Sequence, residues 1–156
     1  TACERDHIRC ERLKFNLERQ GATRVNVLKQ DALSLDDALK FDKILLDAPC
    51  TGTGTIMEGA RIRFSADYLA KCVRAQKKLI GKAIRLLKKG GTLVYSTCSL
   101  LKEENEGAID EALRLGAKLL TADIPSEIPR LPSREGTATI LPTQVYEGFF
   151  VAKLTK

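Results

Sequence analysis

Two cysteines follow short apolar runs and stand among small polar residues, which is a setting typical of reactive thiols. Cys50 ends the segment "KILLDAPC", three residues after Asp47, and Cys98 ends the segment "LVYSTC". A thiolate is a strong nucleophile, and a nearby carboxylate can hold a substrate. Either cysteine alone has a structural interpretation, because cysteine is common in protein cores. Two thiols that follow two neighbouring strands, with an acid beside them, favour a reactive site.

Asp47 comes directly after the apolar residues 44–46, and a carboxylate there is costly to bury without a bonded partner. Pro49 removes a backbone donor and restricts the turn, which projects the neighbouring side chains. We therefore expect the Asp47 carboxylate to accept a hydrogen bond from a ligand or from a neighbouring polar group.

Two further acids follow expected strands. Glu4 comes after the short segment "TAC", and Asp31 ends "RVNVLKQD". At the end of the second strand of a nucleotide-binding sheet, an acid can accept hydrogen bonds from ribose hydroxyls. Asp31 could similarly accept from an adenine amino group. Both acids also fit a capping role at the start of a helix or turn.

The segment "TGTGT" (51–55) does not match a phosphate-binding loop. A dinucleotide fingerprint needs a third glycine where Met57 stands, and no Walker A sequence is present. We expect Gly52 and Gly54 to let the backbone lie close to a ligand.

Alternating helix and strand patterns must position these residues. Residues 5–21 predict a helix that ends at Gly21, and 66–91 predict a long helix, capped by Ser65 or Asp67 and stopped by Gly90 and Gly91. Residues 103–116 predict a third helix. Strands are predicted over 24–31, 41–50, 92–99, 117–122 and 148–154, and a proline-rich loop over 124–142.

This order predicts an α/β fold with a mostly parallel sheet. The continuous apolar run within 41–50 is typical of a parallel strand covered on both faces. Ligands of such sheets bind beyond the carboxyl ends of the strands, which is where Asp47, Cys50 and Cys98 are expected.

The composition sets broad limits. The 156 residues suit one domain and carry a net charge of +6, which is compatible with binding a polyanion such as nucleic acid. The five cysteines are odd in number and favour a reducing cytoplasm. Cys3, His7 and Cys10 give little support for a metal site, and no apolar run is long enough to cross a membrane.

The motifs "DAPCTGTGTI", "VYSTCSL" followed by "KEENE", and "EGFFVAKL" resemble the Sun-type RNA cytosine-C5 methyltransferases, which act on tRNA and rRNA. The motifs occur in the family's order over nearly the whole chain. The resemblance implies a Rossmann-like methyltransferase sheet, mostly parallel with an antiparallel C-terminal strand. It also implies S-adenosylmethionine as methyl donor and RNA as substrate.

The resemblance further implies a role for individual residues. Cys98 corresponds to the nucleophile that adds to C6 of cytosine, and Cys50 to the second cysteine, which helps to release the product. Asp47 would hold the N3/N4 edge of the base near the donor. Glu4 would accept hydrogen bonds from the donor's ribose hydroxyls, Arg9 would flank its adenosine, and Asp31 would bind its adenine end. Arg61 and Arg63 would lie in the basic substrate loop and contact the RNA.

Two elements of the family are absent from these 156 residues: a first strand and the glycine-rich cofactor loop that follows it. We therefore interpret residues 1–156 as the C-terminal part of a catalytic domain. Two alternatives remain, a DNA cytosine-C5 methyltransferase with Cys50 as its Pro-Cys nucleophile and a catalytically incomplete RNA-binding fragment. A small-molecule or protein methyltransferase is disfavoured because it would need no paired cysteines.

Overall fold

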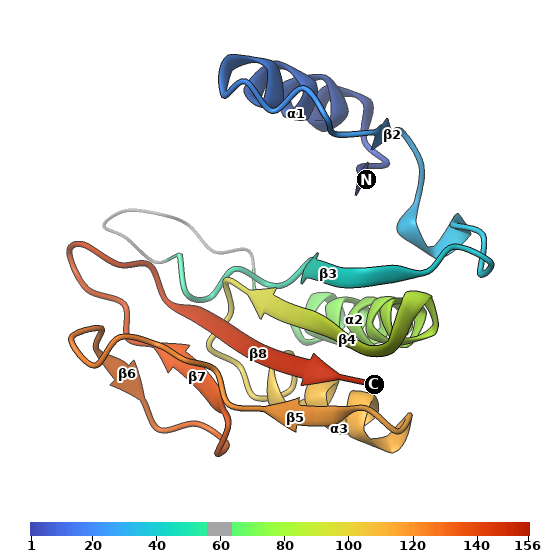
Figure 1. Cartoon of the computed structure of the whole chain (residues 1–156). Helices are drawn as coiled ribbons and strands as arrows, with labels where there is room; N and C mark the ends of the chain where they lie inside the picture. The colour runs from blue at the N-terminus through green and yellow to red at the C-terminus, as the bar shows by residue number, and fades with distance from the viewer. Residues whose placement is uncertain (56–63) are drawn as a thin grey trace. The chain divides into compact units, whose positions relative to one another are not determined.

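The computed structural model describes residues 1–55 and 64–156, and the chain divides into two compact units. The first unit is Thr1–Leu39 and the second is Lys40–Lys156. Figure 1 shows the course of the chain through both. Each unit is described by itself.

The first unit is a small β-α-β arrangement. Strand β1 (Ala2–Cys3) pairs in parallel with β2 (Val27–Leu28), and helix α1 (His7–Arg19) connects them. The side chain of Asp6 caps α1 by accepting from the Arg9 N–H. Gly21 has a φ of 68°, so a glycine follows the helix as predicted. A short 3₁₀ helix, η1 (Ala32–Ser34), comes after β2.

The second unit is a mixed sheet with two helices. Its strands are β3 (Phe41–Asp47), β4 (Leu87–Thr97), β5 (Lys118–Leu120), β6 (Arg130–Leu131), β7 (Thr137–Ile140) and β8 (Phe149–Thr155). They run in the order β3-β4-β8-β7-β6, and β5 also pairs with β8. Strands β3 and β4 are parallel, and β8 lies antiparallel to β4 as expected. This is the α/β architecture that the alternating pattern predicted. The predicted mostly parallel sheet is wrong for this unit, because among its described strands β3 and β4 alone pair in parallel and the other pairs are antiparallel.

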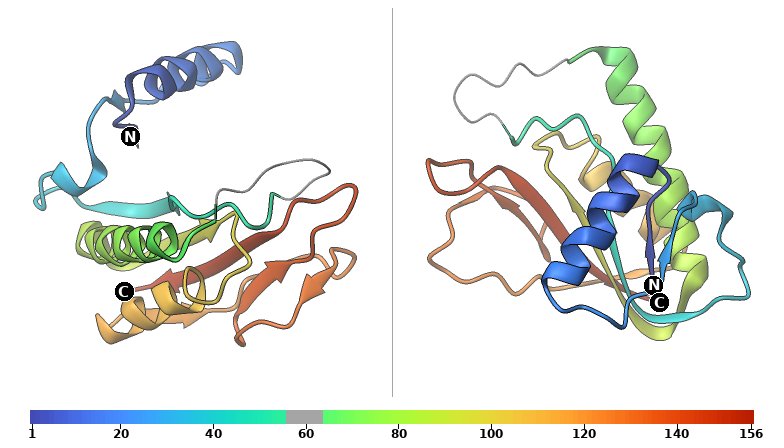
Figure 2. Two further views of the ribbon diagram at one scale, coloured as in Figure 1. Left: turned by 180° about the vertical axis from the view of Figure 1, so that it is seen from behind. Right: turned by 90° about the horizontal axis from the view of Figure 1, so that it is seen from above.

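Helices α2 (Ala66–Leu86) and α3 (Glu106–Arg114) pack side by side against this sheet, as the views from behind and above show (Figure 2). Their apolar faces meet β4 and β8 in one core. Tyr95 and Phe150, both fully buried, contact each other edge to face with ring centroids 6.3 Å apart. The core thus fixes β4, whose end carries Cys98.

Ser65 is the residue that caps α2, since its hydroxyl accepts from the Tyr68 N–H. The predicted end of this helix is wrong. It ends at Leu86, and Leu87 is already extended and paired with Phe41. Leu87 is 2% exposed, so the free energy gained by burying its side chain in the sheet outweighs that gained by continuing the helix. Gly90, with a φ of 76°, instead serves an irregular stretch of β4.

The predicted loop over 124–142 is also partly wrong, because β6 and β7 form an antiparallel pair there. The prolines do not interrupt these strands. Pro129 precedes β6, Pro132 follows it and Pro142 follows β7, so none removes a donor from inside a strand.

Strand β3 is not covered on both faces within its unit. Ile44 and Leu46 pack against the core, whereas Leu45 points to the other face and is 73% exposed. The helices of the second unit lie on one face of its sheet only (Figure 2), which explains the difference.

Candidate active site

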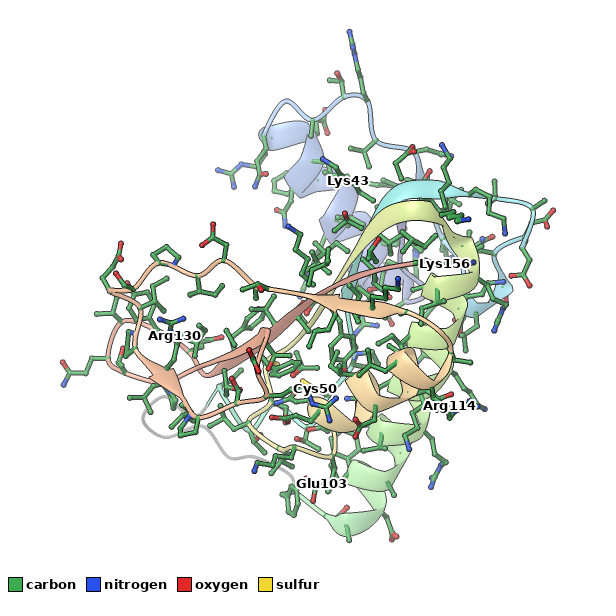
Figure 3. The ribbon with its side chains drawn as sticks, turned by 60° about the horizontal axis from the view of Figure 1, so that its bottom comes forward. Lys43, Cys50, Glu103, Arg114, Arg130 and Lys156 are labelled. Atoms are coloured by element: carbon green, nitrogen blue, oxygen red, sulfur yellow. The ribbon has the colours of Figure 1, made fainter. Side chains whose placement is uncertain are left out.

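The two thiols meet where β3 and β4 end. Asp47, the last residue of β3, is the register partner of Ser96 in β4, so the loops that follow start side by side. The Sγ atoms of Cys50 and Cys98 are 3.2 Å apart, and both residues are half-buried. Figure 3 labels Cys50 among its neighbours. The structure therefore joins the two cysteines that the sequence singled out.

The surroundings of Cys50 keep it a thiol. Burial, together with the hydrogen bond to Cys98, raises the pKa of the Cys50 thiol to about 12. Cys50 therefore keeps its proton near neutral pH, so it is able to donate its S–H to the sulfur of Cys98, 3.2 Å away.

This pKa predicts a pH effect on stability. Folded Cys50 keeps its proton up to about pH 12, whereas the unfolded chain loses it near pH 9.0. Its contribution is fully present below the lower value and is lost as the pH rises toward the higher one. Urea denaturation across this window should therefore show a steeper fall in unfolding free energy for wild type than for Cys50→Ser. If the unfolding free energy fell equally with pH in the two proteins, the raised pKa of Cys50 would be contradicted.

Asp47 is exposed, so the predicted desolvation cost does not arise. Its Oδ1 accepts a 3.1 Å hydrogen bond from the Ser96 hydroxyl, which holds the carboxylate at the strand end. An exposed, oriented carboxylate at the end of the strand that leads to Cys50 can bind an amino group of a substrate.

Gly54 lies close to the backbone of two other segments. Its N–H donates to the Cys98 carbonyl at 2.9 Å, and its own carbonyl accepts from the Gly148 N–H at 2.7 Å. A Cβ on Gly54 would lie 2.0 Å from the Gly148 carbonyl oxygen. Three segments, the Cys50 loop, the Cys98 loop and the start of β8, are thus held in backbone contact.

The acids of the first unit make local contacts. Glu4 follows β1, and its Oε1 accepts from the Asp6 N–H at 2.8 Å and from the Arg9 guanidinium at 2.9 Å. Asp31 caps η1 by accepting from the Leu33 N–H. Glu4 and Arg9 therefore form an ion pair, and Asp31 shows the capping contact that was its alternative interpretation.

Arg61 and Arg63 lie outside the described residues. The described residues contain no group of three or more histidine, cysteine, aspartate or glutamate side chains placed to hold a metal ion. Across 1–55 and 64–156, no helix combines the length and apolar character needed to span a membrane.

Glu104, in the segment between β4 and α3, is fully buried and was not among the predicted site residues. It accepts hydrogen bonds from residues that directly follow each cysteine, Thr51 and Ser99. Its only sequence signal was its place in "KEENE", and nothing local distinguishes it from the exposed Glu103 beside it.

Comparisons with known proteins agree over almost the whole chain. The sequence model of a family described as 16S rRNA methyltransferase RsmB/F matches residues 1–155. A tRNA (cytosine(72)-C(5))-methyltransferase of Pyrococcus horikoshii is 36% identical over 156 residues, covering 99% of this chain and 40% of the relative. Ribosomal RNA small subunit methyltransferase F of Aeromonas salmonicida is 37% identical, covering 92% of this chain and 32% of the relative.

Solved structures give the same result. The crystal structure of NSun6 from Pyrococcus horikoshii with SFG has a TM-score of 0.89 and 35% identity, covering 99% of this chain and 40% of that one. TrmN from Thermus thermophilus, at 17% identity and a TM-score of 0.57, shares the fold alone. The chain spans less than half the length of these two curated relatives.

Proposed function

The chain belongs to the 16S rRNA methyltransferase RsmB/F family, and on this basis we propose that the full-length protein methylates C5 of a cytosine in tRNA or rRNA. The observation that carries the proposal is the contact between Cys50 and Cys98 at the ends of two parallel strands. Relatives with names that specify tRNA cytosine-C5 or ribosomal RNA methylation support it.

Cys98 is the proposed nucleophile. Its thiolate adds to C6 of the cytosine, which makes C5 electron-rich enough to accept a methyl group. Loss of the C5 proton to water and departure of the Cys98 thiolate then restore the aromatic ring. The base must be unstacked for this attack, so a single-stranded or flipped cytosine is the expected substrate.

Cys50 is proposed to assist the departure of Cys98. Because its raised pKa keeps it a thiol, it can donate its S–H to the sulfur that leaves C6. The same contact argues against Cys50 as nucleophile, which the DNA-type alternative requires, since a thiol with that pKa is rarely ionised near neutral pH.

Asp47 is proposed to accept a hydrogen bond from the N4 amino group of the cytosine, with Ser96 holding it in place. Arg61 and Arg63 stay predictions as RNA contacts. The net charge of +6 suits a polyanionic substrate.

S-adenosylmethionine is the proposed cofactor, and it supplies the methyl group. Glu4 fits a ribose contact, because both of the hydrogen bonds described above are made by its Oε1 and the second oxygen can accept from the hydroxyls. Arg9 orients Glu4 and would flank the adenosine, and Asp31 would accept from the adenine end. The five free cysteines suit a reducing compartment, so we propose a cytoplasmic location.

A methyl-transfer assay tests the proposal. Full-length protein with radiolabelled S-adenosylmethionine should label an RNA transcript, and the label should appear in 5-methylcytidine after digestion to nucleosides. DNA of the same sequence should stay unlabelled. Label in DNA alone would favour the DNA-type alternative, and label in neither, with tRNA and rRNA transcripts both tried, would favour an incomplete RNA-binding fragment.

A further inference from the structure

A buried acid lies behind the two thiols. Glu104 is 0% exposed, and a buried carboxylate is costly unless its oxygens are hydrogen-bonded. Here four donors reach it: the Thr51 N–H at 2.9 Å, the Thr51 hydroxyl at 2.5 Å, the Ser99 hydroxyl at 2.5 Å and a Gln76 amide N–H at 3.1 Å. The acid is thus fully engaged inside the protein.

The donors come from the two loops that carry the cysteines. Thr51 directly follows Cys50, and Ser99 directly follows Cys98. Both hydroxyls donate to the same oxygen, Oε2 of Glu104. One side chain therefore joins the two residues next to the thiols, and the 3.2 Å sulfur contact depends on both loops keeping their places.

Helix α2 takes part through Gln76, which is also fully buried. Its Nε2 donates to the Pro49 carbonyl at 2.9 Å as well as to Glu104. If the amide were turned over, its oxygen would face the Pro49 carbonyl and the Glu104 carboxylate, which are both acceptors, so the hydrogen bonds determine its orientation. Its Oε1 is left without a partner among the described residues, which is a cost that a merely space-filling residue would not impose.

A second set of bonds holds the Cys98 loop from the same side. Asn105 donates to the Ser99 carbonyl at 2.8 Å and accepts from the Thr97 hydroxyl at 2.6 Å. The Tyr95 hydroxyl donates to the Glu104 carbonyl at 2.7 Å. The Tyr95 bond holds the backbone of Glu104 itself, and the two Asn105 bonds hold the Cys98 loop that Glu104 contacts.

We propose that Glu104 is a positioning residue that holds the Cys50 and Cys98 loops at the separation their thiols need to act as a pair. What the pair does rests on the function proposed above. The separation itself is a property of the protein alone and is tested without RNA or cofactor.

Exchange with glutathione measures that separation. One oxidised glutathione converts the two thiols to a disulfide and is released as two reduced molecules, so the equilibrium gives the effective concentration of one thiol at the other. Full-length protein is equilibrated in glutathione buffers and quenched with acid. Mass spectrometry then quantifies the peptide pair containing Cys50 and Cys98.

Glu104→Gln replaces an acceptor oxygen by an N–H group that faces donors, and we expect the effective concentration to fall about tenfold or more. The matched control is Glu103→Gln, the same change at the exposed neighbouring residue labelled in Figure 3, which should equal wild type. An unchanged value for folded Glu104→Gln, or an equal fall in both variants, would overturn the proposal.

If circular dichroism shows that Glu104→Gln does not fold, the Ser99→Ala variant is used in its place. It removes one donor to Glu104 and is expected to lower the effective concentration by about threefold; an unchanged value contradicts the proposal. The methyl-transfer assay is read separately. If Glu104→Gln lowers the effective concentration but the wild-type protein methylates no RNA, the positioning role is supported and the proposed function is rejected. If the wild-type protein methylates RNA but Glu104→Gln leaves the effective concentration unchanged, the proposed function is supported and the positioning role is rejected.

Discussion

Full-length protein with alanine at position 98 is expected to form no covalent complex with RNA containing 5-fluorocytosine, and to lose methylation by about three orders of magnitude or more. The fluorine at C5 cannot leave as the proton does, so an adduct through C6 is trapped. Without the Cys98 sulfur no such adduct can form. Denaturing electrophoresis of the protein–RNA mixture detects the complex, and labelled S-adenosylmethionine measures the rate.

Cys50→Ala should behave differently. It keeps the nucleophile, so the complex should still form with 5-fluorocytosine RNA. With ordinary RNA a complex should accumulate, because the sulfur that leaves C6 has lost its hydrogen-bond donor. Cys72→Ala, the same change at a buried cysteine of α2, serves as the control and should resemble wild type. An adduct that survives the loss of Cys98 but not that of Cys50 would make Cys50 the nucleophile.

Gly54→Ala is expected to lower the free energy of unfolding by about 3 kcal/mol or more. The added Cβ would lie 2.0 Å from the Gly148 carbonyl oxygen and 2.9 Å from that of Cys98. Both are backbone atoms, so relief requires the start of β8 or the Cys98 loop to move. Methylation should fall as well, because the Gly54 N–H would no longer hold the Cys98 carbonyl.

Gly107→Ala is the matched control for this substitution. Gly107 lies in α3, and its Cβ would have the Lys102 carbonyl oxygen as nearest neighbour at an ordinary 3.6 Å. Alanine there should leave stability unchanged or raise it by up to about 1 kcal/mol, since alanine favours helix. Urea denaturation of both variants decides, and equal midpoints for Gly54→Ala and wild type would refute the steric argument.

The pairing of the cysteines was predictable from sequence because it follows from a general property of sheets. Parallel neighbours end at the same edge, so residues that directly follow two such strands meet. Cys50 and Cys98 meet for this reason, and β3 and β4 are the parallel pair. The antiparallel β8 was likewise predictable through the motif "EGFFVAKL" and its family resemblance.

Errors arose where local pattern and tertiary burial disagree. The apolar run before Asp47 suggested coverage on both faces, yet Leu45 is 73% exposed because the helices of its unit lie on one face of the sheet. Gly90 and Gly91 suggested a helix end, yet Leu87 had already joined β4. Propensity describes what a segment can adopt, whereas packing decides which option is taken.

The sequence by itself determined the family, the α/β fold and the two thiols, since residue order and periodicity carry that information. Only the tertiary structure decided what holds those thiols in place. Glu103 and Glu104 are identical neighbours, but only Glu104 is buried where two loops and α2 meet. Gly54 and Gly148 are distant in sequence, but their backbones touch. Such contacts depend on which remote segments come together, and no local pattern records that.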